Sequence, residues 1–241
     1  MRTLGVDVSH WEGRIDWQLA RGSIRFAYFK CTDGFQYVDD EFQANLEGCR
    51  EAGIAHAPYH YFQPALDPIA QAEHFVRTAG KGFKKYIVDV EQPEHVQNPG
   101  NKLLAFLTRV EKMTASRPAI YTSAGYWNEF VHPKPDWTSK YELIAAHYTI
   151  EHQPQLPSGW KEWRIWQFSD DWYFPGCSEQ ADADWFNGTP DACEAWFGNA
   201  TPAGENQAEP VRMKFRSLFE ELCIRQAPNV RGAAHRRAAQ G

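Results

Sequence analysis

Cysteine is scarce in this sequence: there are five residues among 241, an odd number, and none has Cys-x-x-Cys spacing. Zinc-finger sites need paired cysteine or histidine ligands, and disulfide frameworks occur in short, cysteine-dense domains. The sequence therefore indicates neither class. A single bridge between Cys177 and Cys193 is left open.

Long apolar runs are also absent, so we expect no transmembrane segment. The N-terminal Met-Arg-Thr-Leu-Gly-Val-Asp leads directly into a strand-like segment and lacks the apolar stretch of a signal peptide. Export by the general secretory route is therefore not expected, unless a leader was removed.

The chain lacks a basic excess, since its formal net charge is −6. General nucleic-acid binders need a basic surface to displace counterions from phosphate, so we expect no nucleic-acid partner. His-Glu-x-x-His, Gly-x-Ser-x-Gly and glycine-rich phosphate loops do not occur, and His56 and His60 fall in a strand-like run without an acidic ligand after them. These absences argue against metallo-hydrolases, serine hydrolases and P-loop enzymes.

Aromatic residues, in contrast, are abundant: they make up 15% of the chain, which fits sugar binding although such rings also fill cores. Short β-branched and aromatic runs alternate with segments of helical period, as in βα units around a parallel sheet. Eight strands are predicted, over residues 4–8, 26–31, 57–62, 86–90, 119–122, 143–147, 164–168 and 183–186. Helices are predicted over 42–52, 69–79 and 102–114, with Gly53 and Gly80 as stops.

Two carboxylates end the apolar run Tyr86-Ile-Val-Asp-Val-Glu91. Residues two apart in a strand share a face, so Asp89 and Glu91 are expected to interact. Two acids held close together cannot both ionise freely, and one is pushed toward the protonated form that a general acid needs near neutral pH. Because β/α barrels place their active sites at the C-terminal ends of their strands, we predict catalysis here.

Acids also occur at the first and last predicted strands, where Asp7 and Asp182 stand. The first and last strands of a closed barrel are neighbours, so we expect these side chains to share the mouth with Asp89 and Glu91. The alternative for any single acid is a helix cap or an ion pair.

Several motifs occur in a defined order: Asp7-Val-Ser-His-Trp-Glu-Gly13 with Ile15-Asp-Trp17, Phe29-Lys-Cys-Thr-Asp-Gly34, Pro58-Tyr-His-Tyr-Phe62, Asp89-Val-Glu91, Ile120-Tyr-Thr122, Ala146-His-Tyr148, Ile165-Trp-Gln-Phe168 and Asp182-Ala-Asp-Trp-Phe-Asn-Gly188. With these motifs the first 190 or so residues resemble glycoside hydrolase family 25, the Chalaropsis-type lysozymes that include many phage endolysins. The family usually has Ala and Glu where Cys31 and Asp33 stand, and often Gln in place of Glu12. These departures affect subsite detail and none of the predicted catalytic acids.

The resemblance implies an α/β fold, an irregular, flattened TIM-like β/α barrel, and cleavage of the β-1,4 bond between N-acetylmuramic acid and N-acetylglucosamine in peptidoglycan, with net retention and without metal or cofactor. Glu91 would be the general acid and Asp89 would orient the substrate's 2-acetamido group for attack on the anomeric carbon. Asp7 and Asp182 would shape the electrostatics of the site. A direct carboxylate nucleophile is the competing mechanism, because the difference rests on distances.

Candidate substrate-binding side chains lie at strand ends. Aromatic candidates for stacking on sugar rings are Trp11, Tyr59, Tyr61, Tyr121, Tyr148 and Trp185, each with core packing as its alternative. Lys30 and Gln167 are expected to bond neighbouring polar groups.

After the barrel, predicted over residues 1–198, residues 199–210 are small, polar and acidic and are predicted to be a linker. In residues 211–241 a basic amphipathic helix over 211–225 is expected, followed by a disordered tail. This helix either packs its apolar stripe on the barrel or contacts an anionic envelope surface.

The sequence leaves three functions open: an active muramidase, a catalytically silent glycan-binding barrel, and another substrate-assisted glycosidase such as a chitinase. The four acids together favour the muramidase, since binding alone needs no protonatable acid beside a second carboxylate. We expect a monomer that is made without a signal peptide and reaches the bacterial cell wall after release, as phage lysins do.

Overall fold

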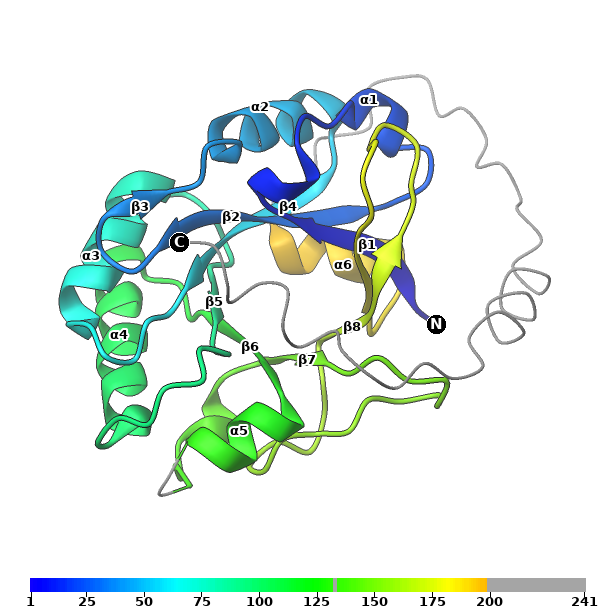
Figure 1. Cartoon of the computed structure of the whole chain (residues 1–241). Coiled ribbons are helices and arrows are strands. Elements are labelled where there is room, and N and C mark those ends of the chain that lie inside the picture. The colour runs from blue at the N-terminus through cyan, green and yellow to red at the C-terminus, as the bar shows by residue number, and fades with distance from the viewer. Residues whose placement is uncertain (132–133, 199–241) are drawn as a thin grey trace. The chain divides into compact units, whose positions relative to one another are not determined.

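The computed structural model describes residues 1–131 and 134–198. Within them, eight strands close into a barrel, and a ninth extends one side of it (Figure 1). The strands are β1 (Thr3–Val8), β2 (Phe26–Asp33), β3 (Tyr37–Val38), β4 (Ala55–Tyr61), β5 (Ile87–Asp89), β6 (Ala119–Ser123), β7 (Leu143–Ala146), β8 (Ile165–Trp172) and β9 (Ala181–Phe186). They follow the order β1-β9-β8-β7-β6-β5-β4-β2, and the pairing of β1 with β2 closes the ring. The predicted TIM-like α/β barrel is confirmed.

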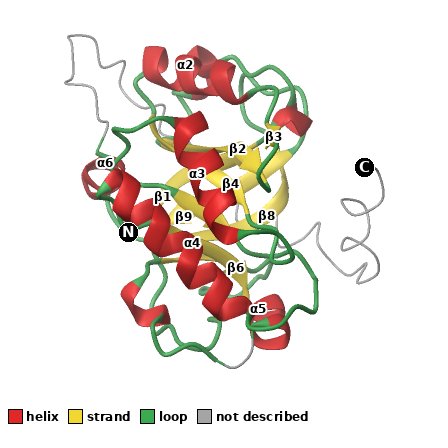
Figure 2. Cartoon of the chain, turned by 90° about the vertical axis from the view of Figure 1, so that its left-hand side faces the viewer, coloured by secondary structure: helices red, strands yellow, loops and turns green. Residues whose placement is uncertain are grey.

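Helices cover the outside of the barrel (Figure 2). They are α1 (Trp17–Ala20), α2 (Phe42–Ala52), α3 (Pro68–Ala79), α4 (Pro99–Thr114), α5 (Ala124–Phe130) and α6 (Pro190–Phe197), with short 3₁₀ turns at His10–Glu12 and Thr138–Lys140. The three predicted helices are present. Two begin earlier than predicted because Pro68 and Pro99 take the first helical turn, where no amide donor is required. No helix in the described part of the chain is both long and apolar enough to span a bilayer.

All eight predicted strands are present, but the expectation of a purely parallel sheet was wrong. Strand β9 runs antiparallel to both β1 and β8. The reason is the connection between β8 and β9, which is a hairpin loop between Trp172 and Ala181 with no helix in it. A parallel neighbour requires a long crossover, whereas a hairpin returns the chain in the opposite direction. The sequence also gave no signal for β3, α1, α5 and α6.

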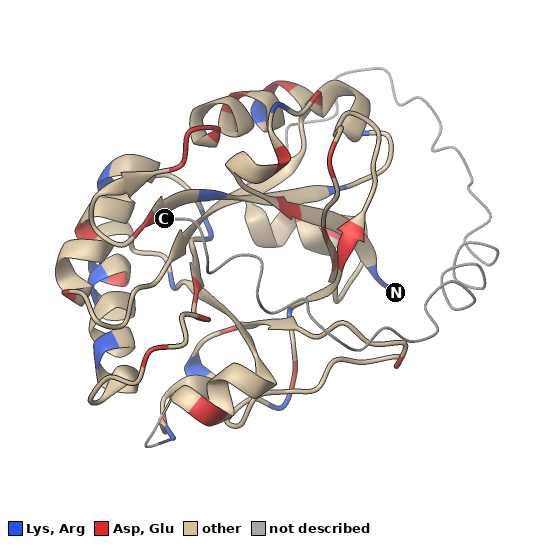
Figure 3. Ribbon diagram, viewed as in Figure 1, with Lys and Arg blue, Asp and Glu red and all other residues tan. Residues whose placement is uncertain are grey.

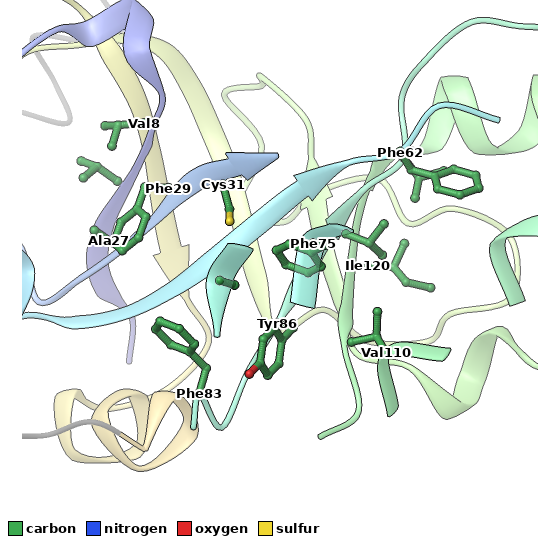
Figure 4. Close-up of a cluster of buried hydrophobic side chains, with 14 of the residues drawn as sticks. Val8, Ala27, Phe29, Cys31, Phe62, Phe75, Phe83, Tyr86, Val110 and Ile120 are labelled. Atoms are coloured by element: carbon green, nitrogen blue, oxygen red, sulfur yellow. The ribbon is translucent and has the colours of Figure 1, made fainter. Parts of the chain in front are cut away.

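Successive side chains of each strand point alternately to the inner face and the outer face of the barrel. Side chains on the outer face, including Val8, Phe29 and Val88, join the layer between strands and helices that Figure 4 shows in part. Those on the inner face fill the barrel with Phe26, Ala57, Ile87, Ala119, Ile144, Ile165 and Phe186. This second cluster also contains Trp196 and Phe197 of α6, and the Phe197 ring stacks on Phe26 with ring centroids 5.4 Å apart. Helix α6 therefore closes the end of the barrel where β2 begins.

The bridge between Cys177 and Cys193 does not form: both are free thiols. Cys193 is buried with the inner cluster beside α6, whereas Cys177 is half-buried and its Sγ contacts the carbonyl oxygen of Glu12. The two cysteines therefore belong to different packing environments. The predicted linker and the amphipathic helix over 211–225 lie outside the described residues, so the division into 1–198, 199–210 and 211–241 stays a prediction.

Close packing inside the barrel depends on Gly5 in β1. A Cβ at this position would lie 2.5 Å from the ring of Phe26. Because that ring is wedged between β1 and α6, it cannot move away without disturbing the inner cluster. We predict that Gly5→Ala destabilises the fold by about 1–3 kcal/mol, the usual cost of overpacking a core.

Thermal and urea unfolding measure this effect. Gly22→Ala is the matched control, because the nearest atom to an added Cβ there is 3.7 Å away. The control should change the free energy of unfolding by no more than about 0.5 kcal/mol, as is usual for surface substitutions. Equal stability of the two variants would contradict the packing described for Gly5.

Candidate active site

The inner face of the barrel changes from apolar to polar toward the end where the parallel strands finish, which we call the mouth. Alternation along each strand places the polar side chains on the same face as the inner apolar cluster. Figure 3 shows acidic positions on the neighbouring strands β1 and β9 and at the end of β5. The predicted site residues on this face are Asp7, Lys30, Tyr59, Tyr61, Asp89, Glu91, Tyr121, Gln167 and Asp182.

Asp89 is the last residue of β5, and Glu91 follows two positions later. Asp89 is buried and Glu91 half-buried. Burial raises the pKa of the Tyr61 hydroxyl well above its usual range, and the charges of Asp89 and Glu91 raise it further. Burial also raises the pKa of Tyr126, and the charges of the same two carboxylates raise it further. Asp89 and Glu91 therefore act on the same tyrosine hydroxyls, as expected if they share one side of the mouth.

Asp7 and Asp182 face each other across β1 and β9, where they are paired in register. This pairing bears out the expectation that the two acids are neighbours. Asp182 stands near the beginning of β9, and the antiparallel direction of that strand brings its beginning to the mouth. Both carboxyls are buried.

Gln167 of β8 connects these acids to the tyrosines. Its Nε2 donates to Asp7 Oδ2 at 2.7 Å, and its Oε1 accepts hydrogen bonds from the hydroxyls of Tyr121 and Tyr148, each at 2.8 Å. Burial is the main cause that raises the pKa of Tyr148. The negative charges around it raise this pKa further, and they come from Asp182, Asp170, Asp7 and Glu91. The hydroxyl of Tyr148 therefore lies within the field of acids from both sides of the mouth.

Lys30 supplies a positive charge in this region. Its Nζ lies 3.3 Å from Asp33 Oδ2 and 4.8 Å from the centre of the Tyr61 ring. Gln63 donates to the other oxygen of Asp33 at 2.7 Å, and the Tyr61 hydroxyl donates to Gln92 Oε1 at 3.0 Å. Lys30 and Gln167 thus bond neighbouring polar groups, as expected.

The aromatic candidates divide into three groups. Trp11 and Tyr148 are exposed, at 58% and 49% of their surface, so a ligand could reach part of each residue. Tyr59 and Tyr121 are buried on the inner face, and Tyr61 is half-buried. Trp185 is not brought together with the others: it follows Asp184 in β9, so its side chain turns outward, where it stacks on Phe168 at 5.0 Å.

Residues that the sequence did not single out also belong to this network. Asp184 is fully buried, and its Oδ1 accepts a hydrogen bond from the Tyr28 hydroxyl at 2.8 Å. Burial raises the pKa of Asp184 to about 8, and the charge of Asp182 adds to this increase. The signal in the sequence was the spacing of two from Asp182, the same spacing that relates Asp89 to Glu91.

Two surface cavities, of about 350 and 460 Å³, lie away from the mouth. The first is lined by Arg50, His56 and Phe83, among others, and the second by residues of α3 and α4. Neither contains any of the acids described above. The concentration of acids and hydroxyls therefore distinguishes the mouth from both cavities.

Comparison with known proteins gives the family. The model of glycosyl hydrolases family 25 matches residues 6–177. Lysozyme M1 of Streptomyces globisporus is 32% identical over 202 residues, which cover 77% of this chain and 68% of that protein. A bacterial lysozyme from Streptomyces coelicolor superposes with a TM-score of 0.77 at 29% identity, covering 83% of this chain and 99% of that one. A muramidase from Acremonium alcalophilum gives a TM-score of 0.72 at 26% identity, covering 81% and 98%. The chain therefore belongs to glycosyl hydrolases family 25 and is a glycoside hydrolase.

Proposed function

We propose that the protein is a lysozyme, an N-acetylmuramidase that hydrolyses the β-1,4 bonds between N-acetylmuramic acid and N-acetylglucosamine in peptidoglycan. The observation that carries the proposal is the pair Asp89 and Glu91 at the end of β5, surrounded by tyrosine hydroxyls inside a family 25 barrel. Relatives named as lysozymes and muramidases support it. The place of action is then the bacterial cell wall.

In the proposed mechanism Glu91 is the general acid. Its proton passes to the glycosidic oxygen as the bond from that oxygen to the anomeric carbon breaks, and the oxygen of the substrate's own 2-acetamido group attacks that carbon. Asp89 orients the acetamido group and stabilises the positive charge that develops on it. Water then opens the cyclic intermediate and gives a proton back to Glu91, and two displacements at one carbon leave the configuration retained.

Asp7 and Asp182 are proposed to act through their charge. Negative charges near Glu91 disfavour its ionisation, which keeps a proton on it at neutral pH. The same charges attract the positive charge that develops at the sugar ring in the transition state. A carboxylate acting as a direct nucleophile stays the competing mechanism.

The proton-donor role predicts the effect of Glu91→Gln. The amide matches the carboxyl in shape but cannot protonate the leaving group, so kcat should fall by about 10²–10⁴, the usual contribution of general acid catalysis. Folding and glycan binding should be little changed. The measurement is the loss of turbidity of a purified peptidoglycan suspension, with binding followed by co-sedimentation. Glu129→Gln, an exposed change in α5, is the control and should lyse at the wild-type rate. Full lysis by the Glu91 variant would remove Glu91 from the proposed role.

Bond specificity is tested by the products. Digestion of purified peptidoglycan, followed by mass analysis of borohydride-reduced fragments, should give muramic acid at the new reducing ends. Glucosamine at those ends would indicate a glucosaminidase. Glycan binding without new reducing ends would indicate a binding barrel without catalysis. Either result would overturn the proposed muramidase activity.

A further inference from the structure

Asp39 is a buried acid that the proposed mechanism does not use. Its side chain is 0% exposed, and it directly follows β3, the strand that pairs with the end of β2. Its Oδ2 accepts hydrogen bonds from the backbone N–H of His10 at 3.1 Å and from Nδ1 of the His10 ring at 2.8 Å. Its Oδ1 accepts from the backbone N–H of Glu41 at 3.1 Å. These donors replace the hydration that burial removes from the carboxylate.

The residue that Asp39 holds belongs to a short turn that carries Trp11. This 3₁₀ turn, His10–Glu12, begins one residue after the end of β1 and so lies at the mouth of the barrel. The buried carboxyl of Glu12 secures the same turn, since its Oε2 accepts from the backbone N–H of Ser9 at 2.7 Å. Trp11 lies between these two anchored residues and is 58% exposed. Trp11 is therefore presented to solvent on a turn that two buried carboxylates hold.

Aromatic rings lead from this turn toward the proposed catalytic acids. The rings of Trp11 and His10 have centroids 4.5 Å apart, and those of His10 and Tyr37 are 6.1 Å apart. Lys30 Nζ lies 6.0 Å from the centre of the Tyr37 ring and 4.8 Å from that of Tyr61, one of the tyrosines influenced by the carboxylate pair of β5. We call Trp11, His10 and Tyr37 the aromatic rim. It is continuous with the mouth.

The charges around the aromatic rim disfavour an anionic ligand. Asp33, Asp40 and Glu41 stand on the segment around β3. Nearby cations are already paired, Lys30 with Asp33 at 3.3 Å and Arg14 with Glu41 at 3.1 Å. An uncharged sugar ring with apolar C–H groups matches exposed aromatic side chains better. The polymer that the mouth is proposed to cleave also continues beyond the scissile bond, so its strand has to cross the edge of the mouth.

We propose that the aromatic rim binds sugars of the peptidoglycan strand beyond the scissile bond, and that Asp39 is a positioning residue that holds Trp11 in place for them. The proposal rests on the proposed function, because the ligand is the strand that the mouth cleaves. Asp39 acts through His10 and touches no sugar. Contacts away from the reacting bond stabilise the bound substrate and the transition state alike, so the rim lowers KM and leaves kcat unchanged.

Binding of a peptidoglycan octasaccharide to the Glu91→Gln protein, measured by calorimetry, tests the rim without turnover. In that background Trp11→Ala should raise Kd about five- to tenfold, as expected for the loss of an aromatic contact. In the active enzyme the same change should raise KM by a similar factor and alter kcat by less than about twofold. Leu19→Ala, an exposed apolar change in α1, is the control and should alter none of these constants.

The positioning role is tested by combining variants. Asp39→Ala should also raise Kd and KM without changing kcat, and the double variant with Trp11→Ala should bind about as weakly as Trp11→Ala alone, because Asp39 acts through the turn that carries Trp11. A general loss of packing would instead add to the effect of Trp11→Ala. Asp39→Asn keeps an oxygen that accepts from His10, so its Kd should lie between those of the wild type and Asp39→Ala. This variant decides the question if Asp39→Ala does not fold.

The contrary results separate the rim from the proposed function. Wild-type affinity in Trp11→Ala, or additive effects in the double variant, would overturn the proposal, while continued lysis by the wild type would leave the proposed function intact. A Trp11→Ala protein that keeps octasaccharide binding but loses binding to vesicles of anionic phospholipid would assign the rim to a lipid surface and also overturn it. If the Glu91→Gln protein does not bind the octasaccharide and the wild type does not lyse peptidoglycan, the proposed function and the rim fail together.

Discussion

The constraint on which this structure depends is the alternation of side chains in a closed ring of strands. A barrel of eight strands has one narrow interior, and every second residue must point into it. At one end, Phe26, Phe186 and the rings of α6 fill that space with apolar surface. At the other end the same faces carry Asp7, Asp89 and Gln167, so the acids are held inside a packed wall and remain close to solvent at the mouth.

Buried acids are tolerable only when hydrogen-bond donors replace their hydration. Gln167 performs this task for Asp7 and is itself held by two tyrosine hydroxyls. Tyr28 of β2 donates to one carboxyl oxygen of Asp184. These hydrogen bonds orient the acids before a substrate arrives, and such preorganised groups act on a developing charge without the cost of reorienting water.

Much of the architecture could be predicted from the sequence, because strand-like runs and helical periods report local burial. The carboxylate pair was predictable because residues two apart in a strand share a face. The direction of β9 was not, since its predicted span, residues 183–186, gives no strand direction and the hairpin preceding it has no sequence signal of its own. Trp185 was misplaced among the sugar-binding candidates because its face depends on the register of β9. Asp184 was overlooked as a site residue because its burial comes from β1, β2 and β8 together.

A crystal structure of the Glu91→Gln protein with a bound peptidoglycan tetrasaccharide would show where the glycan lies relative to the four acids. We expect a sugar chain across the mouth, with the glycosidic oxygen within hydrogen-bonding distance of residue 91 and the acetamido N–H of the muramic acid donating to Asp89. We also expect Asp7 and Asp182 to bracket the same sugar ring. A tetrasaccharide bound at the outer helical layer, or one whose scissile bond lies beyond the reach of both residues, would rule out the proposed active site.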